Sequence, residues 1–389
     1  MLLAWLQSRV AFSCANPGYA GVSRAAATAA SHIYDEAVCV EPDGTILTVE
    51  VGGYVVEGIT NIVRKQVDGA SCVFKVDRGD GGDAAILREA KVMKELGRHH
   101  AFVRCFGTVV WLGDVHLRLE YAPRGTLFDL FAEAPLGPIP ASQFVCPMLQ
   151  VTEALCYAHA KGVAHCDLKE EQFLVFAGTL PGGDAIVKLG DFGASKILKH
   201  GEKVLLSCWT LGIGPMVPEN ALVDAMANDV FCYGEILRGV VTFTLAGFDH
   251  DELCDCRVDR ALVGIDQKKI EAVEADEYDA GDPTHVPYIV STQATAEEAD
   301  AHLRARAALA AEDVAKASDP LAKALGDLAV AMMAAREDDR PSILDVASRL
   351  RRAVQVEFAR QARENAELKA ELAKSRKPKS SKKALKEKN

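Results

Sequence analysis

The chain has 389 residues, and its 44 Lys and Arg against 55 Asp and Glu give a formal net charge of −11. Apolar residues make up 49% and charged residues 25%, which is ordinary for a globular protein and excludes wholesale disorder and collagen-like repeats. No run of about 18 or more apolar residues occurs, so the sequence predicts no transmembrane segment. The 11 cysteines form no C-x-x-C pair, which favours free thiols in a reducing compartment over disulfides or a zinc ribbon.

The two ends of the chain differ from its body in composition. Residues 1–34 contain no acid and are rich in Ala and Ser, which is typical of an organelle transit peptide and equally of a plain flexible extension; we assign 1–45 to this N-terminal extension. Residues 373–389 carry eight Lys and Arg and one Glu, which indicates a disordered basic tail that contacts an acidic partner or an import receptor. The body is acidic and has no groove-reading motif, so nucleic acid is not expected as a partner. These features predict an intracellular protein, cytoplasmic or nuclear, with organellar import as the alternative.

Strand-like patterns dominate the first part of the body. Alternating apolar residues predict several strands between about Ile46 and Asp77, separated by glycine-containing turns. An amphipathic helix is predicted over Asp83–Leu96, and two further strands near 103–111 and 115–121. These elements indicate a small antiparallel sheet that carries one helix.

Beyond Gly125 the pattern becomes helical. Helices are predicted near residues 126–131, 142–161, 229–239, 321–336 and 343–352. Residues 249–282 carry twelve Asp and Glu against four Lys and Arg, which indicates a solvated acidic insertion, assigned to 249–300. A sheet-rich lobe followed by a helical lobe predicts a two-lobed α+β fold with a cleft between the lobes.

The end of the helical part has a pattern of its own. Apolar and amide side chains recur at spacings of three and four at Phe358, Gln361, Asn365, Leu368 and Leu372. The run fits a short coiled coil but covers only about two heptads, so an amphipathic helix that packs on the helical lobe or stands in solvent is preferred. Residues 354–389 are assigned to this helix and the basic tail.

Two acidic residues stand in short loops beside strand-like apolar pairs. They are Asp167, within His165–Val175, and Asp191, within Val187–Gly193. Phosphoryl transfer uses such a pair, because one carboxylate orients the attacking hydroxyl and accepts its proton while the other holds Mg²⁺ against the phosphates. Lys169, two residues after the first acid, can then meet the charge that develops on the transferred group. This region is therefore the predicted catalytic centre.

The same residues resemble the catalytic motifs of the eukaryotic protein kinases. Residues 165–172 match four of the six specified letters of the family's H-R-D-L-K-x-x-N loop, and its D-F-G is intact as Asp191-Phe192-Gly193. The resemblance spans about residues 46–353 and implies a sheet-rich lobe at 46–122 and a helical lobe at 123–353. It also implies a Ser/Thr-directed enzyme, since Lys169 stands two residues after the catalytic acid, as in those members.

Further motifs follow in the order of the family. The resemblance implies that Lys75 is the strand lysine that positions the α- and β-phosphates and that Glu89 is its ion-pair partner. Glu120 and Ala122 match the hinge, whose backbone reads the adenine edge. The later A-P-E, D-V-W and R-P-S motifs, of which the arginine pairs with the A-P-E glutamate in the family, are matched by Val217-Pro218-Glu219, Asp229-Val230-Phe231 and Arg340-Pro341-Ser342.

The departures from the family pattern concern nucleotide, metal and phosphate contacts. The glycine loop keeps only Gly58 of its three glycines and ends at Val63, so we expect a stiffer lid with a weaker grip on phosphates. Gln172 replaces the asparagine that holds the second Mg²⁺; Asp191 would carry the main metal, with Gln172 helping. Cys166 replaces the arginine that pairs with a phosphorylated activation loop, which removes the usual receptor for that switch.

The sequence leads to two principal hypotheses. The first is an ATP- and Mg²⁺-dependent Ser/Thr protein kinase, in which Asp167 orients the hydroxyl of a protein substrate and Lys169 stabilises the transferring phosphoryl group. The second is a pseudokinase, a nucleotide-binding or scaffolding module without phosphotransfer, which the missing glycines, Cys166 and Gln172 favour. A small-molecule kinase fits less well, because the 217–219 motif and Arg340 belong to the protein-kinase pattern.

Overall fold

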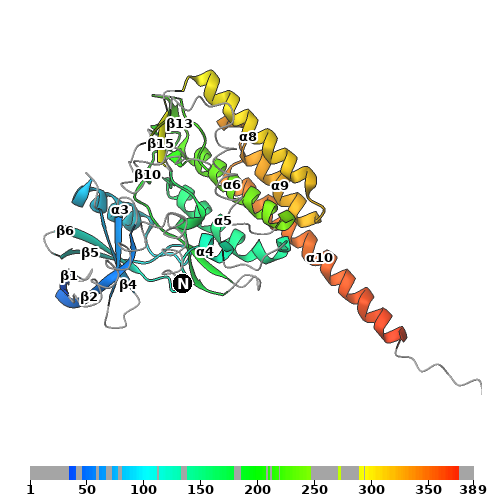
Figure 1. Cartoon of the computed structure of the whole chain (residues 1–389), viewed down its shortest axis with the longest axis horizontal. Helices are drawn as coiled ribbons and strands as arrows, with labels where there is room; N and C mark the ends of the chain where they lie inside the picture. The colour runs from blue at the N-terminus through cyan, green and yellow to red at the C-terminus, as the bar shows by residue number, and fades with distance from the viewer. Residues whose placement is uncertain are drawn as a thin grey trace, which may run out of the picture.

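The computed structural model describes residues 35–40, 46–57, 61–66, 72–77, 81–111, 114–132, 138–178, 185–206, 209–210, 213–218, 220–246, 270–272, 289–292 and 294–375. The predicted leader at 1–34, the basic tail after residue 375 and most of the acidic insertion lie outside these residues. Figure 1 shows a sheet-rich lobe beside a larger helical lobe, from which one long helix projects. The predicted two-lobed α+β fold is confirmed.

The smaller lobe is an antiparallel barrel of six strands in the order β1-β2-β3-β4-β6-β5. Its strands are β1 (Asp35–Val40), β2 (Ile46–Glu57), β3 (Asn61–Gln66), β4 (Cys72–Asp77), β5 (Cys105–Trp111) and β6 (Asp114–Glu120). The barrel closes because β1 pairs with β2 along its whole length and with β5 through Val38 and Val110. The sequence pattern did not predict β1, whose residues fall within the range assigned to the N-terminal extension.

One helix, α3 (Gly82–Leu96), packs against β4, β5 and β6 of this barrel. Its buried residues recur every three or four positions, as the amphipathic pattern predicted, and are Ile86, Glu89, Val92, Met93 and Leu96. The helix ends at Gly97, whose φ of 72° is easily adopted only by a residue without a Cβ. A charged residue, Glu89, therefore lies on the face that α3 turns toward the barrel.

The larger lobe is built around α6 (Ala225–Ala246), which packs against α8 and α9. Its other helices are α4 (Leu127–Ala132), η2 (Ala141–Phe144), α5 (Val145–Ala160), η3 (Glu170–Gln172), α8 (Ala296–Lys316), α9 (Pro320–Met332), η5 (Glu337–Asp339) and α10 (Ile343–Ser375). The core includes the fully buried rings of Phe131, Phe144, Phe173 and Tyr233. Burial of such large side chains stabilises the lobe by about 1.5–3 kcal/mol each.

Short strand pairs border several loops of the larger lobe. The strands are β7 (Val163–Ala164), β8 (Phe173–Ala177), β9 (Ile186–Leu189), β10 (Lys196–Ile197), β11 (Val204–Leu205), β12 (Trp209–Thr210), β13 (Leu222–Val223), β14 (Ile270–Ala272) and β15 (Ile289–Thr292). β8 pairs with β9 and β7 pairs with β10. The two predicted acidic loops lie between these strands, which fixes where each loop begins and ends.

Two helices differ from the sequence prediction. α8 was not predicted, and its first residues fall within the range assigned to the acidic insertion; Thr295 and Glu298 form a reciprocal capping box at its start. α10 runs to Ser375, far beyond the predicted end near residue 352, and Phe358, Leu368 and Leu372 are exposed on it. The preferred alternative of a solvent-standing helix describes this segment (Figure 1). Among the described residues, no helix combines the length and apolar character that crossing a membrane requires.

Candidate functional site

Three charged side chains from three separate elements meet at one point. Lys75 stands on β4, Glu89 on α3 and Asp191 directly after β9. The Lys75 Nζ atom donates to Glu89 Oε2 at 2.8 Å and to Asp191 Oδ1 at 2.6 Å. The Lys75 and Glu89 side chains are almost fully buried, whereas 41% of the Asp191 side chain is exposed. The structure thus brings together three residues that the sequence assigned to nucleotide and metal binding.

Lys75 and Asp191 stabilise each other's charged forms. Burial by itself would lower the pKa of Lys75, but the carboxylates of Asp191 and Glu89 outweigh it and raise that pKa above its ordinary value. Burial would likewise raise the pKa of Asp191, yet the ammonium group of Lys75 holds it well below its usual range. Lys75 and Asp191 are therefore both charged at neutral pH.

A second group of polar side chains lies in the loop between β7 and β8. Asp167 Oδ2 is 3.0 Å from Lys169 Nζ and accepts a hydrogen bond of 3.2 Å from Gln172 Nε2. Burial would lower the pKa of Lys169, but Asp167 and then Glu171 raise it above its ordinary value. The arrangement joins the two predicted catalytic residues, Asp167 and Lys169, in one ion pair. Gln172, predicted as a metal ligand, directs its amide nitrogen at Asp167.

The backbone of this loop is anchored to α6 by Asp229. Its Oδ2 accepts from the N–H of His165 at 2.7 Å and its Oδ1 from the N–H of Cys166 at 2.8 Å, while His159 Nε2 lies 2.9 Å from Oδ2. Cys166 adopts a positive φ of 68°, which is costly for a residue with a side chain. The carboxylate therefore holds a strained turn directly before Asp167. The sequence signal for this anchor was its Asp229-Val230-Phe231 motif, to which we assigned no role.

The loop that carries Asp191 is fixed by its neighbours. The Phe192 N–H donates to Glu89 Oε1 at 3.2 Å, and the Phe192 ring packs edge-on against Phe102 at a centroid distance of 5.6 Å. On its other side the ring centroid of His165 is 5.3 Å away, and His165 Nε2 is 3.0 Å from the Gly190 carbonyl oxygen. The two acidic loops are thus packed against each other and against α3.

The predicted adenine-reading residues lie where β6 ends and the chain passes to the larger lobe. Both carboxylate oxygens of Glu120 accept from Lys188 Nζ at 2.8 Å, and the Glu120 N–H donates to the Arg104 carbonyl oxygen. Ala122 is buried just beyond the strand. Because Lys188 occupies the Glu120 side chain, only the backbone of this segment remains for reading a base.

Val63, the last of the predicted glycine-loop residues, lies on the β2–β3 hairpin. Val63 is on β3, directly opposite Lys75 of β4 and paired with Val56 of β2. Gly58 lies outside the described residues. The hairpin therefore places Val63 next to the lysine of the ion triad.

The contacts of Arg340 with described residues lie at the start of α6 and in the loop after α9. Glu219, its expected partner, lies outside the described residues. Arg340 donates to Asn228 Oδ1 at 3.1 Å and to the Ala334 carbonyl oxygen at 2.9 Å, and its guanidinium lies 5.0 Å from the centre of the Phe231 ring. It joins the start of α6 to the loop after α9.

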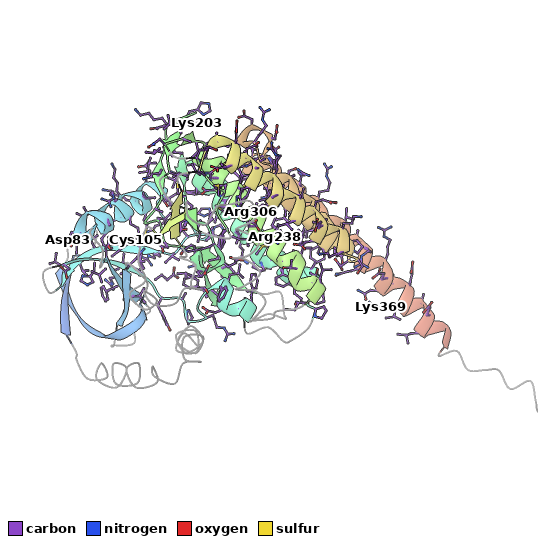
Figure 2. The ribbon with its side chains drawn as sticks, turned by 45° about the horizontal axis from the view of Figure 1, so that its top comes forward. Asp83, Cys105, Lys203, Arg238, Arg306 and Lys369 are labelled. Atoms are coloured by element: carbon purple, nitrogen blue, oxygen red, sulfur yellow. The ribbon has the colours of Figure 1, made fainter. Side chains whose placement is uncertain are left out.

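A buried ionic network, absent from the sequence prediction, joins α6 to α8 (Figure 2). Glu235 accepts from Arg238 Nε at 2.7 Å and from Arg306, and Arg238 also pairs with Asp313 at 2.9 Å. Arg306 further donates to the Gly214 carbonyl oxygen at 2.6 Å. Gly214, Asp167 and Cys166 line a common small pocket. The network therefore supports the chain segment that faces the predicted catalytic acid.

The family model and the relatives reported below are all protein kinases. A family model described as "Protein kinase domain" matches residues 55–349, more than half of the chain. Serine/threonine-protein kinase GIN4 of Saccharomyces cerevisiae is 29% identical over 193 residues, 49% of this chain and 16% of that protein. Receptor-interacting serine/threonine-protein kinase 1 of Homo sapiens is 34% identical over 109 residues, 28% of this chain and 15% of that protein.

A plant protein gives a similar match. CBL-interacting protein kinase 4 of Oryza sativa subsp. japonica is 29% identical over 177 residues, 44% of this chain and 37% of that protein. The matched segments thus span well under half the length of each of these three relatives.

Proposed function

The chain belongs to the protein kinase family, and we propose that it is an ATP-dependent enzyme that transfers the γ-phosphoryl group to Ser or Thr hydroxyls of protein substrates. The observation that carries the proposal is the buried triad of Lys75, Glu89 and Asp191, with Nζ–O distances of 2.8 and 2.6 Å. A phosphate-binding lysine held by a helix glutamate, next to a metal-binding aspartate, is the arrangement that kinase catalysis requires. The names of two of the relatives, which are serine/threonine kinases, support the Ser/Thr class.

In this proposal the smaller lobe binds the nucleotide. Lys75, fixed by Glu89, contacts the α- and β-phosphates, and the backbone of Glu120 and Ala122 contacts the adenine edge. Val63, on β3 beside Lys75, covers the base, and Gly58 is assigned to the phosphate contact. The bond between Lys188 and the Glu120 carboxylate supports a backbone role for the hinge, because it removes the side chain from the contact.

Asp191 is the residue best suited to hold Mg²⁺. Lys75 and the Gly193 N–H both bond to its Oδ1, so Oδ2 is the oxygen left for a metal, and 41% of the side chain is exposed. Carboxylate and amide oxygens are the hard ligands that Mg²⁺ prefers. Gln172 can add its amide oxygen, since its nitrogen already bonds to Asp167. Bound Mg²⁺ would supply positive charge to the phosphates during transfer.

Asp167 and Lys169 carry the chemistry of transfer. Asp167 pairs with Lys169, and its carboxylate orients the substrate hydroxyl and accepts its proton. Lys169 lies beside that carboxylate and can turn its ammonium toward the charge that develops on the transferred group. Asp229 supports both by fixing the backbone just before them.

A pseudokinase remains the second candidate, and one observation favours it. Gln172 donates its amide N–H to Asp167 Oδ2, so the group that replaces the family asparagine is bonded to the catalytic carboxylate. A donor on that oxygen competes with the substrate hydroxyl. In this second reading the cleft binds a nucleotide or acts as a scaffold without transferring phosphate.

Phosphorylation of a generic basic protein by the purified chain, with labelled ATP and Mg²⁺, tests the first proposal. Lys75→Met, Asp167→Ala and Asp191→Asn should each abolish transfer, whereas Lys203→Met, which removes a lysine from an exposed surface pair, should leave it unchanged. Wild-type protein that transfers no more phosphate than these three variants contradicts the enzymatic proposal. Thermal-shift titration then separates the alternatives, because a ligand that binds only the folded state raises the melting temperature. Stabilisation by ATP in the absence of transfer supports the pseudokinase.

A further inference from the structure

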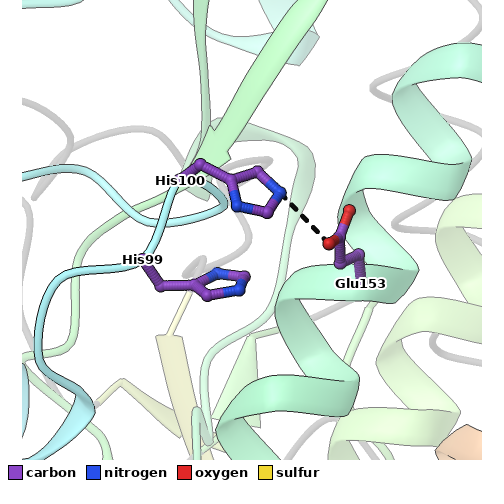
Figure 3. A group of neighbouring side chains, drawn as sticks. All are labelled: His99, His100 and Glu153. Carbon is purple, nitrogen blue, oxygen red and sulfur yellow. Dashed lines mark ion pairs between the residues drawn. The ribbon is translucent and has the colours of Figure 1, made fainter.

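Two consecutive histidines and a glutamate gather at a surface point where the loop after α3 meets α5. His99 and His100 follow Gly97, the last residue of the α3 cap, and Glu153 lies on α5 (Figure 3). Figure 3 shows both rings directed toward the helix that carries Glu153. Each of the three side chains offers a ligand atom, and these atoms all lie within 4.8 Å of one another.

The His99 ring is held in this orientation by a contact outside the cluster. The His99 ring stacks on Tyr157 at a centroid distance of 4.0 Å and an interplanar angle of 25°, and it lies 4.3 Å from the ring of His100. Tyr157 in turn donates to the Leu96 carbonyl oxygen at 3.2 Å, in the last turn of α3. Because Tyr157 fixes one ring and the second ring lies beside it, the pair is arranged before any ligand arrives.

The three side chains supply the donor atoms that a metal cation needs. Each imidazole has a nitrogen lone pair that can bind a metal. Glu153 adds a negative charge, with its Oε1 at 3.1 Å from His100 Nε2.

We propose that His99, His100 and Glu153 form a binding site for one Zn²⁺ ion, with a water molecule as the fourth ligand. Two imidazole nitrogens and one carboxylate oxygen are a ligand set that zinc uses in sites with an open position. In a tetrahedral site with bonds of about 2.0–2.2 Å, the ligand atoms are about 3.4 Å apart. The His100–Glu153 distance of 3.1 Å already fits, so binding requires mainly a small rotation of His99.

One hydrogen bond must change for this rotation. His99 Nδ1 accepts from the Ala101 N–H at 3.3 Å, which leaves Nε2 as the coordinating atom. Coordination through Nε2 moves the ring proton to Nδ1 and gives up this long hydrogen bond. Imidazole-rich sites select zinc over Mg²⁺, which prefers oxygen ligands, so the Mg²⁺ of a kinase assay does not compete for it.

Zinc at this point would connect the two lobes. His99 and His100 follow the helix that carries Glu89, whereas Glu153 belongs to a helix of the larger lobe. The ion adds a tie beside the Tyr157–Leu96 hydrogen bond and limits how far the end of α3 can move away from α5. Zinc binding is therefore expected to raise the melting temperature of the chain.

Equilibrium dialysis of the chelator-treated full chain against Zn²⁺ tests the site. The chain has 11 cysteines that can also bind zinc, so the comparison is made between variants that share them all. The His99→Ala/His100→Ala double variant should bind one Zn²⁺ fewer per chain than wild type. Glu153→Gln should weaken that one site by at least about tenfold. His200→Ala, which removes an exposed histidine elsewhere, should bind as wild type does.

Thermal shift provides a second measurement that does not depend on counting ions. The increase in melting temperature on adding Zn²⁺ should be smaller in the double variant and in Glu153→Gln than in wild type and His200→Ala. Mg²⁺ should produce no such difference between the four proteins. Equal zinc stoichiometry and equal zinc-dependent shifts in all four proteins would overturn the proposal. The substituted side chains of His100 and Glu153 are 72% and 47% exposed, so these variants are expected to fold.

Discussion

Replacing Glu235 with glutamine would test whether the network between α6 and α8 stabilises the fold. Glu235 is a buried carboxylate that accepts from Arg238 Nε at 2.7 Å and from Arg306. The substitution keeps the shape of the side chain and removes its charge. Arg238 then keeps its pair with Asp313, whereas Arg306 loses the charge of Glu235, and the new amide NH₂ faces an arginine donor.

The expected cost follows from this imbalance. Removing one partner of a buried ion pair costs about 3–5 kcal/mol, because it leaves a buried charge without compensation. The Gly214 carbonyl still accepts from Arg306 at 2.6 Å, so we expect the loss of unfolding free energy to lie toward the lower end of this range. With a urea dependence of about 3 kcal/mol per M, the unfolding midpoint should fall by about 1 M or somewhat more.

The matched control is Asp300→Asn. Asp300 pairs with Arg304 on the surface of α8, with 41% and 65% of the two side chains exposed. Exposed pairs contribute about 0–1 kcal/mol, so this variant should unfold within about 0.3 M urea of wild type. Circular dichroism at 222 nm follows the helices of the larger lobe in both variants.

The dependence on pH gives an independent check. Burial would raise the pKa of Glu235, but Arg238 and Arg306 outweigh it and hold that pKa below its ordinary value of 4.5. A folded-state pKa below the unfolded value stabilises the protein above pH 4.5, and this contribution is lost as the pH falls further. The difference between wild type and Glu235→Gln should therefore be full at pH 7 and shrink below pH 4.5. A difference no larger than that of Asp300→Asn, or one that does not change with pH, would refute the reasoning.

Three further substitutions have defined outcomes. Asp229→Asn leaves one acceptor oxygen for the two N–H groups that the carboxylate anchors in the wild-type protein. Phosphotransfer should therefore fall, and the unfolding free energy should drop by about 2–4 kcal/mol. Unchanged activity and an unchanged urea midpoint would contradict this prediction. Gly234→Ala places a Cβ 2.9 Å from Met332 Cβ, and we expect a loss of about 1–3 kcal/mol in urea unfolding despite the better helix propensity of alanine; a stabilised variant would show that the helices can separate freely. Thr295→Ala removes the capping box of α8 and should cost about 1 kcal/mol in the same assay, with no cost arguing that the cap is not formed in solution.

Apolar periodicity predicted the helices whose buried face is apolar. α9 buries Leu321, Leu325, Leu328 and Met332 on one side, and the sequence shows that spacing directly. Such a pattern is local, because it depends on side chains within a few turns. The helix can therefore be predicted without information about the elements around it. Its exact end, at Met332 and not near residue 336, depends on the cap.

The same reasoning missed α8 for a physical reason. Its buried face includes His302, Arg306 and Asp313, which are polar. They are tolerated there because Glu235 and Arg238, far away in sequence, neutralise part of the charge. A search for apolar periodicity assigns polar residues to the solvent-facing side of a helix. The buried face of α8 could be recognised only if its ionic partners on α6 were already known. Strand β1 was missed similarly, because its pairing with β5 joins distant segments.

The residues of the candidate site that belong to ordered sequence motifs could be predicted from the sequence. Lys75, Glu89 and Asp191 were identified from their resemblance to a family, and the distances between them confirm that they meet. Their roles in binding and catalysis stay predictions. The bonding partners of Gln172 and Glu120 could not be predicted, since each depends on how a side chain turns within a folded environment.

The length of α10 has a mechanical consequence. From Phe358 onward the helix is largely exposed, and Arg360 bonds along it to Glu357 and Glu364. At about 1.5 Å per residue, the part from 358 to 375 extends roughly 25 Å from the larger lobe. The far end of a flexible linker of that length would take many positions, whereas a helix fixes both the distance and the direction of its far end. Deleting two residues would shorten this arm by only about 3 Å but rotate its far end by about 200°. The number of residues in the projecting part of α10 therefore sets the direction in which a group attached at its end would face.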